Sequence, residues 1–202
     1  MKITIIGHGA GNVASVERAL ARIGVEPERT LAPESILRAK ALILPGVGHF
    51  GSLVRALEGN SLRAPLLEVI ARGVPFLGIC LGLQALYEFS DEAPTLRGLG
   101  TLPGQVCALP PQTKLPHMGW NRVHALGGSR LFHAIPADSY FYFAHSFAAL
   151  SIGSAETVAT CNYGSEFVAA IERGNLFGIQ FHPEKSGEAG AQLLRNFARL
   201  AT

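Results

Sequence analysis

A single cysteine lies where two hydrophobic patterns meet in residues 73–89, GVPFLGICLGLQALYEF. Residues 74–79 are a continuous apolar run typical of a buried strand, and the run after the cysteine is typical of a helix. Gly78 and Gly82 lie two residues before and after Cys80. Because a strand that passes directly into a helix belongs to folds in which helices cover a parallel sheet, this joint predicts an α/β architecture.

The first half of the chain repeats this alternation of strand-like and helical patterns. We expect further strands at residues 2–6 and 41–44, and helices at residues 12–23 and 63–72, the second with Pro65 in its first turn. Buried strands that are joined through helices run parallel and are covered on both faces.

The second half holds shorter strand candidates separated by Gly, Pro, Asn and Ser, which indicates antiparallel pairs added to the parallel core. They are residues 104–109, 119–126, 140–145, 156–161, 167–174 and 175–182. The last segment, residues 187–200, has the apolar period of a helix. We therefore expect a three-layer α/β fold: an open, mixed but mainly parallel sheet flanked by helices, with additional antiparallel strands.

Composition limits the number of domains and the kinds of partner. The 202 residues, 48% hydrophobic and 16% charged, show no repeat or linker, so we expect a single domain over residues 1–202. The net charge is +2 without a run of Lys or Arg, and no apolar stretch approaches the ~20 residues of a membrane span, so we expect no nucleic-acid or membrane partner. Three widely spaced cysteines without a Cys-x-x-Cys pair fit reduced thiols in the cytoplasm and no metal site.

The glycines of residues 7–12, GHGAGN, raise the question of a dinucleotide site. Asn12 stands where the G-x-G-x-x-G fingerprint has its third glycine. No convincing second strand that ends in an acidic residue follows, since residues 25–31 read VEPERTL. We favour a tight strand-to-helix turn over a nucleotide site.

Cys80 has two interpretations. A cysteine at a strand-to-helix turn can be a nucleophile, because the strained backbone projects its side chain at the carboxyl edge of the sheet, where open α/β folds bind ligands. The N-terminus of the next helix favours a thiolate, and the N–H of Leu81 would point toward a reacting carbonyl oxygen. The alternative is a small buried hydrophobic side chain, which we favour for Cys107 and Cys161 because they lie inside strand-like runs.

A second glycine-rich bend, residues 44–51 (LPGVGHFG), ends the strand candidate at 41–44. Glycine permits positive φ and the close approach of a ligand to the backbone. The bend is therefore either a mobile turn or a set of backbone N–H groups offered to an anion or a developing oxyanion.

A thiol nucleophile needs a base, and His182 is the best-placed histidine. It ends a strand candidate, and Glu184 follows two residues later, on the same side of an extended chain. The carboxylate could receive one imidazole N–H and stabilise the imidazolium. Cys80 and His182 would meet if both strands end at the same edge of one sheet. The other histidines have no acid at this spacing, and for most we expect surface or core positions: His8, His49, His117, His124, His133 and His145.

These motifs together resemble the class I, or triad, glutamine amidotransferases. The elbow of that family reads G-x-C-x-G-x-Q, as in GVPFLGICLGLQ, and its base motif reads H-P-E, as in GIQFHPEKSG. The segment PGVGHFG lies upstream in the right order. HMGWN (117–121), YFAHSF (142–147) and HPEKSG (182–187) are similar to one branch of the family, the glutaminase subunits of imidazole glycerol phosphate synthases. The resemblance covers essentially the whole chain.

The resemblance implies a role for each matching residue. Cys80 would be the nucleophile, His182 the base and acid, and Glu184 the carboxylate that orients the histidine. Glutamine would be hydrolysed to glutamate and ammonia through a thioester, with no cofactor or metal. The residues implied in substrate and oxyanion binding are Gly46, Val47, Gly48, Leu81, Gln84, His145, Ser146 and Phe147. The chain departs from the family at Phe147, where Tyr is common, and at GHGAGN, where an acidic or aromatic residue is frequent near the start of the turn.

The resemblance also implies a partner: a cyclase subunit with a (β/α)₈ barrel, in a heterodimer, that receives the ammonia and makes imidazole glycerol phosphate and an aminoimidazole carboxamide ribotide. Trp120, the only tryptophan, is an aromatic anchor candidate for this interface, with core packing as its alternative. The interface residues that we expect are Asn12, His117, Met118, Trp120, Asn121, Tyr142 and Lys185.

Two other functions stay open at this point. One is a glutaminase that serves another synthase, such as those that make anthranilate, aminobenzoate or pyridoxal phosphate. The other is a thiol sensor or dinucleotide-binding module without enzymatic activity, built on a similar sheet.

Overall fold

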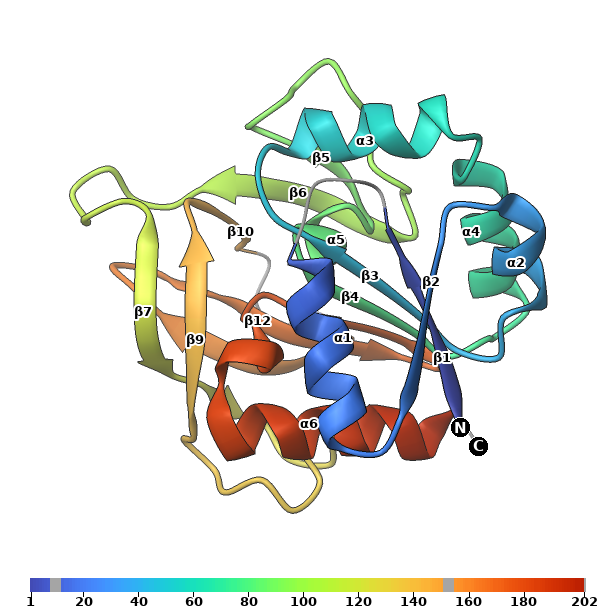
Figure 1. The fold of residues 1–202 in the computed structure, drawn as a ribbon. Helices are drawn as coiled ribbons and strands as arrows, with labels where there is room; N and C mark the ends of the chain where they lie inside the picture. The colour runs from blue at the N-terminus through green and yellow to red at the C-terminus, as the bar shows by residue number, and fades with distance from the viewer. Residues whose placement is uncertain (8–11, 151–154, 202) are drawn as a thin grey trace.

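The computed structural model describes residues 1–7, 12–150 and 155–201. A mixed sheet of eight strands in the order β2-β1-β3-β4-β13-β12-β11-β8 runs through the molecule (Figure 1). β2, β1, β3, β4 and β13 run parallel to one another. The pairs β13–β12, β12–β11 and β11–β8 are antiparallel. The strands are β1 (Lys2–Ile6), β2 (Glu26–Thr30), β3 (Leu42–Gly46), β4 (Phe76–Cys80), β8 (His124–Ala125), β11 (Thr157–Asn162), β12 (Glu166–Arg173) and β13 (Leu176–Ile179).

Two small sheets and a set of helices surround this sheet. β10 (Phe147–Ala149), β6 (Leu102–Ala108) and β5 (Tyr87–Ser90) form one small sheet, and β7 (His117–Arg122) pairs with β9 (Tyr140–His145) in the other. The helices are α1 (Val13–Arg22), α2 (Pro33–Arg38), α3 (Phe50–Gly59), α4 (Arg63–Ala71), α5 (Leu81–Gln84), the 3₁₀ helix η1 (Pro183–Lys185) and α6 (Gly187–Leu200). Within the described ranges, no helix is long and apolar enough to cross a membrane.

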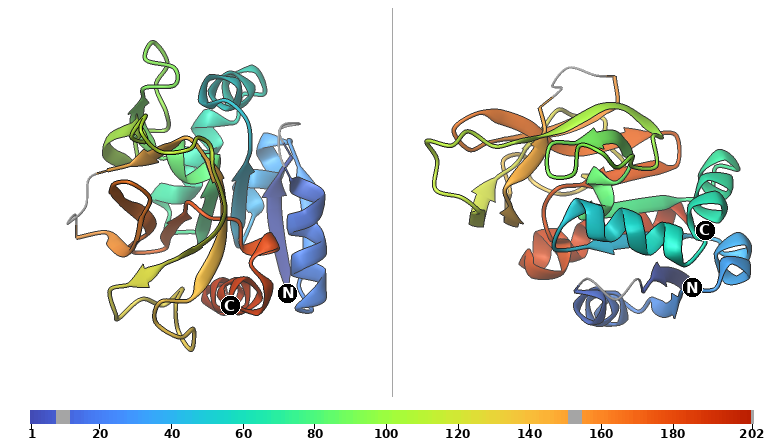
Figure 2. Two further views of the ribbon diagram at one scale, coloured as in Figure 1. Left: turned by 90° about the vertical axis from the view of Figure 1, so that its left-hand side faces the viewer. Right: turned by 90° about the horizontal axis from the view of Figure 1, so that it is seen from above.

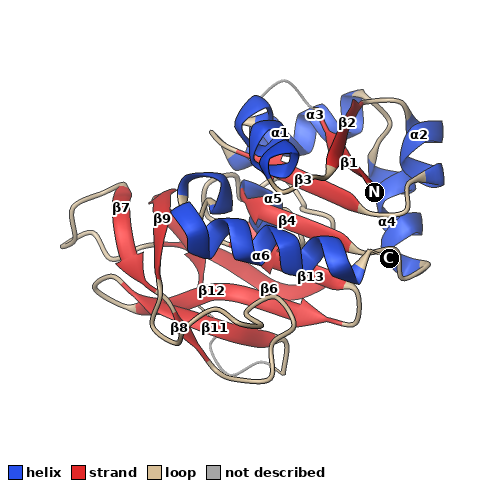
Figure 3. Cartoon of the chain, turned by 60° about the horizontal axis from the view of Figure 1, so that its bottom comes forward, coloured by secondary structure: helices blue, strands red, loops and turns tan. Residues whose placement is uncertain are grey.

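The helices divide between the two faces of the central sheet, and each face has its own hydrophobic core. On one face α1 and α6 bury Leu20 and Phe197 against sheet residues such as Leu77. On the other face α3 and α4 bury Phe50 and Leu66. The two turned views of Figure 2 show this layering, and Figure 3 shows α1 and α6 in front of the sheet. The expected three-layer α/β fold is confirmed.

One sequence expectation was wrong at the edge of the sheet. Residues 25–31 were not expected to form a strand, but Glu26–Thr30 is β2 and pairs with β1 in parallel. Pro27 lies within it, which a strand tolerates at a sheet edge because one side needs no hydrogen bonds. The strand ends at Thr30 and not in an acidic residue. The glycine turn before α1, with His8, lies outside the described residues except for Gly7 and Asn12.

The helix after Cys80 is shorter than its apolar run indicates. α5 ends at Gln84, and Tyr87–Ser90 forms strand β5, parallel to β6. Four residues are too few for periodicity to separate a strand from a helix, and in β5 only Tyr87 and Ser90 are buried.

Candidate active site

Cys80 occupies a strained turn between β4 and α5. Its φ of +53° and ψ of −106° lie outside the regions that non-glycine residues usually adopt. The flanking glycines are required by close packing: a Cβ on Gly82 would lie 1.8 Å from the carbonyl oxygen of Leu44, and one on Gly78 would lie 2.6 Å from the carbonyl oxygen of Gly82. The first turn of α5 therefore presses against the end of β3, and the cysteine takes the strain.

The register of the sheet brings the glycine-rich bend to the same place. Gly46 of β3 pairs with Cys80 of β4, and beyond it Gly48 adopts a φ of +98°, which favours glycine. A cavity of about 190 Å³ opens beside the cysteine. It is lined by Val47, Gly48, Cys80, Leu81, Gln84, Glu92, Pro116 and residues 144–147. Its size suits a ligand smaller than a drug-sized molecule.

His182 and Glu184 form a buried pair next to this cavity. The imidazole Nδ1 lies 2.8 Å from Glu184 Oε1, and the two side chains are 2% and 1% exposed. The N–H of His182 donates to the Tyr142 carbonyl at 2.8 Å, and the Ser186 hydroxyl donates to the His182 carbonyl at 2.6 Å. The expected extended geometry was wrong in detail: η1 turns the chain after His182 and brings Glu184 back to the ring.

The charges of this cluster are mutually dependent. Burial lowers the pKa of His182, but the Cys80 thiolate and the Glu184 carboxylate outweigh it and raise that pKa to about 10. Burial also acts to raise the pKa of Glu184, but the hydrogen bond from His182 and its charge hold that pKa below the ordinary value. Asn12 Nδ2 donates to the same carboxylate oxygen at 3.0 Å. The arrangement favours an imidazolium on His182 paired with a carboxylate on Glu184, beside the sulfur of Cys80.

Two buried glutamines continue the cluster behind the cysteine. Gln180 Nε2 donates to Cys80 Sγ at 3.5 Å, and Gln84 Nε2 donates to Gln180 Oε1 at 3.1 Å and to the Phe147 carbonyl at 2.7 Å. Gln180 was not selected from the sequence.

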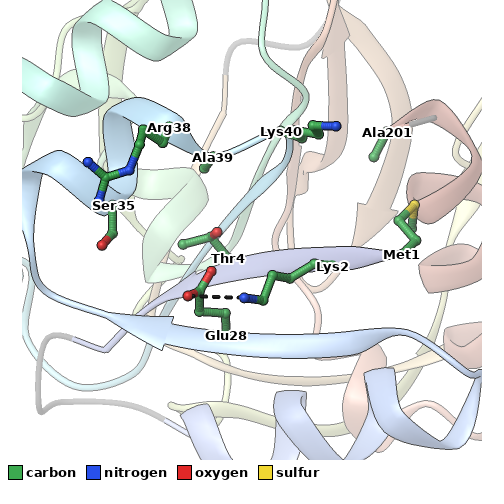
Figure 4. Close-up of a pocket in the computed structure, with 9 residues that line it drawn as sticks. All are labelled: Met1, Lys2, Thr4, Glu28, Ser35, Arg38, Ala39, Lys40 and Ala201. Atoms are coloured by element: carbon green, nitrogen blue, oxygen red, sulfur yellow. Dashed lines mark ion pairs between the residues drawn. The ribbon is translucent and has the colours of Figure 1, made fainter.

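A larger cavity, of about 570 Å³, lies elsewhere and has a different chemistry (Figure 4). It is found where β1 begins, at the end of the sheet opposite Cys80, and Lys2 pairs there with Glu28 at 3.3 Å. Its other lining residues are Met1, Thr4, Ser35, Arg38, Ala39, Lys40 and Ala201. Because it offers neither a thiol nor an imidazole, we place the candidate active site in the smaller cavity.

Comparison with known proteins agrees with this geometry. The sequence model of the family described as glutamine amidotransferase class-I matches residues 4–201. This chain belongs to the class I glutamine amidotransferases. A relative from Moorella thermoacetica, imidazole glycerol phosphate synthase subunit HisH, is 47% identical over 198 residues, which cover 98% of this chain and 94% of the relative.

Two further comparisons place this amidotransferase among its neighbours. Imidazole glycerol phosphate synthase hisHF from Emericella nidulans is 42% identical over 96% of this chain but only 37% of its own length. A crystal structure of a glutamine amidotransferase superposes with a TM-score of 0.79 at 20% identity and covers 98% of both chains, which supports the fold.

Most residues expected to bind substrate lie at the cavity of this amidotransferase. Val47, Gly48, Leu81, Gln84 and residues 145–147 line it, and Gly46 adjoins it in β3. Their individual roles, and those of Cys80, His182 and Glu184, stay predictions. In the described part of the chain, no group of three or more His, Cys, Asp or Glu side chains could hold a metal ion.

The expected interface residues divide into exposed and buried ones. Met118 and Trp120 are 64% and 55% exposed, so core packing of the tryptophan was the wrong alternative. His117 was wrong as a partner contact, because its side chain is buried. Its ring stacks on Tyr163 with the ring centroids 4.0 Å apart, and its Nδ1 lies 3.1 Å from His145 Nε2.

Two polar residues at the site of the amidotransferase were not predicted from the sequence. Glu92 lines the cavity and accepts the N–H of Phe50 at 2.6 Å, although it lies in a turn that carries no motif. Gln180 had a usable signal, since it lies two residues before His182 near the end of β13. Both depend on tertiary contacts that spacing along the chain does not show.

Replacing Gly82 tests whether the glycine is needed because its Cα packs closely against β3. In Gly82→Ala the new methyl group meets the Leu44 carbonyl, so we expect a free energy of unfolding about 2–3 kcal/mol lower and slower alkylation of Cys80. Urea unfolding and iodoacetamide labelling measure the two effects. Gly59→Ala is the matched control, because nothing lies within 4 Å of its Cβ position and stability should be unchanged or higher. Equal behaviour of the two variants would contradict the packing argument.

The buried histidines beside the cavity should make stability fall in acid. Burial lowers the pKa of His117 to about 4 and that of His145 to about 3, below the 6.5 of an unfolded chain. The unfolded state therefore binds more protons at acidic pH, so their contribution is present above pH 6.5 and is lost as the pH falls through these values. Between pH 7 and pH 5 we expect urea unfolding to show a loss of roughly 1–3 kcal/mol.

A histidine variant tests the origin of this acid sensitivity. His145→Gln should flatten the dependence of the unfolding free energy on pH, whereas the exposed His133→Gln should leave the slope unchanged. A slope that is identical in the wild type and His145→Gln would assign the acid sensitivity to other groups.

Proposed function

We propose that this chain is the glutaminase subunit of an imidazole glycerol phosphate synthase. It hydrolyses glutamine to glutamate and ammonia and passes the ammonia to a cyclase subunit. The observation that carries the proposal is the buried His182–Glu184 pair next to a strained Cys80 that lines a small cavity. The relatives described above favour this synthase over others that use glutamine.

The first half of the reaction uses the charges of the cluster. Because the pKa of His182 is raised to about 10, the ring is protonated at neutral pH and supports a thiolate on Cys80. The thiolate attacks the side-chain amide carbon of glutamine and forms a tetrahedral oxyanion. Imidazolium then donates its proton to the departing nitrogen, so that ammonia leaves and a γ-glutamyl thioester remains on the sulfur.

The second half regenerates the thiolate. Neutral His182, held by Glu184 through Nδ1, takes a proton from water through its Nε2, which has no hydrogen-bond partner among the described residues. The activated water attacks the thioester carbonyl and releases glutamate. Asn12 and the backbone of η1 keep Glu184 in place, so the imidazolium that is consumed in the first half-reaction and formed in the second faces the same carboxylate.

The cavity offers complementary groups to glutamine. Val47, Gly48 and Leu81 line the cavity, and we expect the backbone N–H of Leu81 and the peptides of Val47 and Gly48 to bind the oxyanion. Glu92 is the one carboxylate among the described lining residues, so it suits the α-ammonium group of the substrate. Gln84 and the segment 145–147 surround the remaining amino-acid end.

Ammonia must leave the cavity under cover, because in water it is protonated and is no longer a nucleophile. The hisHF relative is much longer than this chain, which supports a cyclase in permanent contact with the glutaminase. We expect the cyclase, with its (β/α)₈ barrel, to bind this chain as a heterodimer at the ribbon formed by β7 and β9.

The β7–β9 ribbon has the properties of a docking surface. Met118 and Trp120 project from it with more than half of their surface exposed, which is unusual for large apolar side chains. Lys185 lies over the Tyr142 ring at 5.3 Å and places a charge at the border of this surface. With three free cysteines, we propose that the enzyme works in the reducing cytoplasm, as one amidotransferase domain over residues 1–202.

Removal of the nucleophile tests the proposal. With the cyclase subunit and its substrate analogue present, the wild type should hydrolyse glutamine, and Cys80→Ala should lose at least roughly 10³-fold of the rate. A glutamine-analogue electrophile should label Cys80 and spare the other two cysteines. Cys107→Ala is the control and should keep the wild-type rate. A wild type that neither hydrolyses glutamine nor is labelled, with the cyclase bound, would favour a thiol sensor.

The charge at Glu92 should act on substrate binding. Glu92→Gln keeps an oxygen for the Phe50 N–H but removes the charge that faces the α-ammonium group. We expect KM for glutamine to rise about 10- to 100-fold with a small change in kcat. The exposed Glu58→Gln should change neither constant. A fall in kcat at constant KM would place Glu92 in another role.

A further inference from the structure

We propose that Gln180 is a catalytic residue of this glutaminase: its side-chain N–H group donates a hydrogen bond to Cys80 Sγ, holds the sulfur in its attacking position and stabilises the thiolate. The inference rests on the proposed function and adds a residue to the reaction described above. It starts from a distance of 3.5 Å between Nε2 and the sulfur, with the Gln180 side chain fully buried.

The register of the sheet fixes where Gln180 lies. Ile179 of β13 pairs with Ile79 of β4 in parallel, so the next residues of the two strands, Gln180 and Cys80, stand side by side at the carboxyl edge. The Gln180 backbone N–H is held by the Ala169 carbonyl at 2.9 Å. The neighbouring strand β12 therefore also fixes the backbone of Gln180, and its side chain reaches the sulfur from a rigid element.

The hydrogen bonds behind Gln180 fix which end of its amide faces the sulfur. The Phe147 carbonyl only accepts, so Gln84 must turn its NH₂ group toward it, at 2.7 Å. The same nitrogen lies 3.1 Å from one end of the Gln180 amide, which must then be the oxygen. The other end, the NH₂ group, faces Cys80, and the reversed orientation would place two donors against each other.

The same carbonyl is held from its other side by a chain of histidines. His145 Nδ1 lies 2.9 Å from the Phe147 oxygen and must donate to it, so His145 Nε2 accepts the Nδ1–H of His117 at 3.1 Å. His117 Nε2 in turn accepts from Asn121 Nδ2 at 3.2 Å. Every proton position in this chain is determined, so Gln180 is oriented by a complete network and cannot flip at low cost.

The Gln180 N–H acts on the sulfur and not on the substrate. Gln180 is absent from the described residues that line the cavity, so its loss should leave glutamine binding intact. A sulfur that accepts a hydrogen bond from an amide N–H is held in one direction, and the charge that it carries during the attack faces a donor. The contribution is needed before the tetrahedral intermediate forms.

Substitution of Gln180 in the full chain tests the inference. Gln180→Met removes the donor at similar size, and Gln180→Glu keeps an oxygen for Gln84 but places an acceptor against the thiolate. For both variants we expect iodoacetamide labelling of Cys80 at neutral pH, followed by mass spectrometry, to be roughly 10- to 100-fold slower. In complex with the cyclase, kcat for glutamine should fall by a similar factor at unchanged KM. The exposed Gln112→Glu is the matched control.

A measurement on the wild type covers the case in which both variants misfold. The side-chain amide of Gln180, followed by ¹⁵N NMR, should shift strongly when Cys80 is alkylated, whereas the amide of Gln192, which donates to Asn196, should not. Wild-type labelling rates in the folded variants, a rise in KM alone, or an unshifted Gln180 amide would each overturn the inference. A wild type without glutaminase activity would instead overturn the proposed function, and the labelling and NMR results would still decide whether Gln180 serves the sulfur.

Discussion

The close packing of the Cys80 elbow against strand β3 is the constraint on which the site depends. Gly46, Gly78 and Gly82 each face neighbouring atoms at distances that no Cβ could occupy. The absence of these three side chains lets the first turn of α5 approach β3, and this approach forces Cys80 into its positive φ. The proposed oxyanion-binding groups, the sulfur and the cavity lie together because these three positions carry no side chain.

The three cysteines of this chain lie in different environments. Burial raises the pKa of Cys161 to about 12 and also raises that of Cys107, so both remain thiols without a nearby cation. The environment of Cys80 differs, because a buried imidazolium and an amide donor face its sulfur. Burying charge is costly, and specific partners reduce that cost here: Glu184 Oε1 accepts from Asn12 and lies against His182 Nδ1, and Gln180, held by Gln84, donates to the sulfur. We therefore expect the reactivity of each cysteine to depend on the groups that face its sulfur and not on its exposure.

Features with a local cause were predictable from the sequence. The elbow, the parallel strands and the His182–Glu184 pair each follow from residue types at short spacing. Strand β2 was missed because its proline and charged residues are tolerated only at a sheet edge, and β5 was missed because its four residues are too few to show a period. Glu92 and the inward direction of His117 depend on which segments the fold brings together, so no local pattern could reveal them. Gln180 lies two residues before His182, but its contact with Cys80 also depends on the fold.

Strand β7 links the proposed docking surface to the hydrogen bonds behind Cys80, because its side chains alternate. Met118 and Trp120 point outward, whereas His117 and Asn121 point inward and begin the hydrogen-bond chain that ends at the Phe147 carbonyl. The two faces belong to one backbone, so a partner that shifts this strand must also shift the histidines or break their bonds. Those bonds are buried or partly buried and each has one allowed direction, which makes small displacements costly. A cyclase bound to the ribbon would therefore act on the group that orients Gln84 and Gln180 without touching the cavity itself.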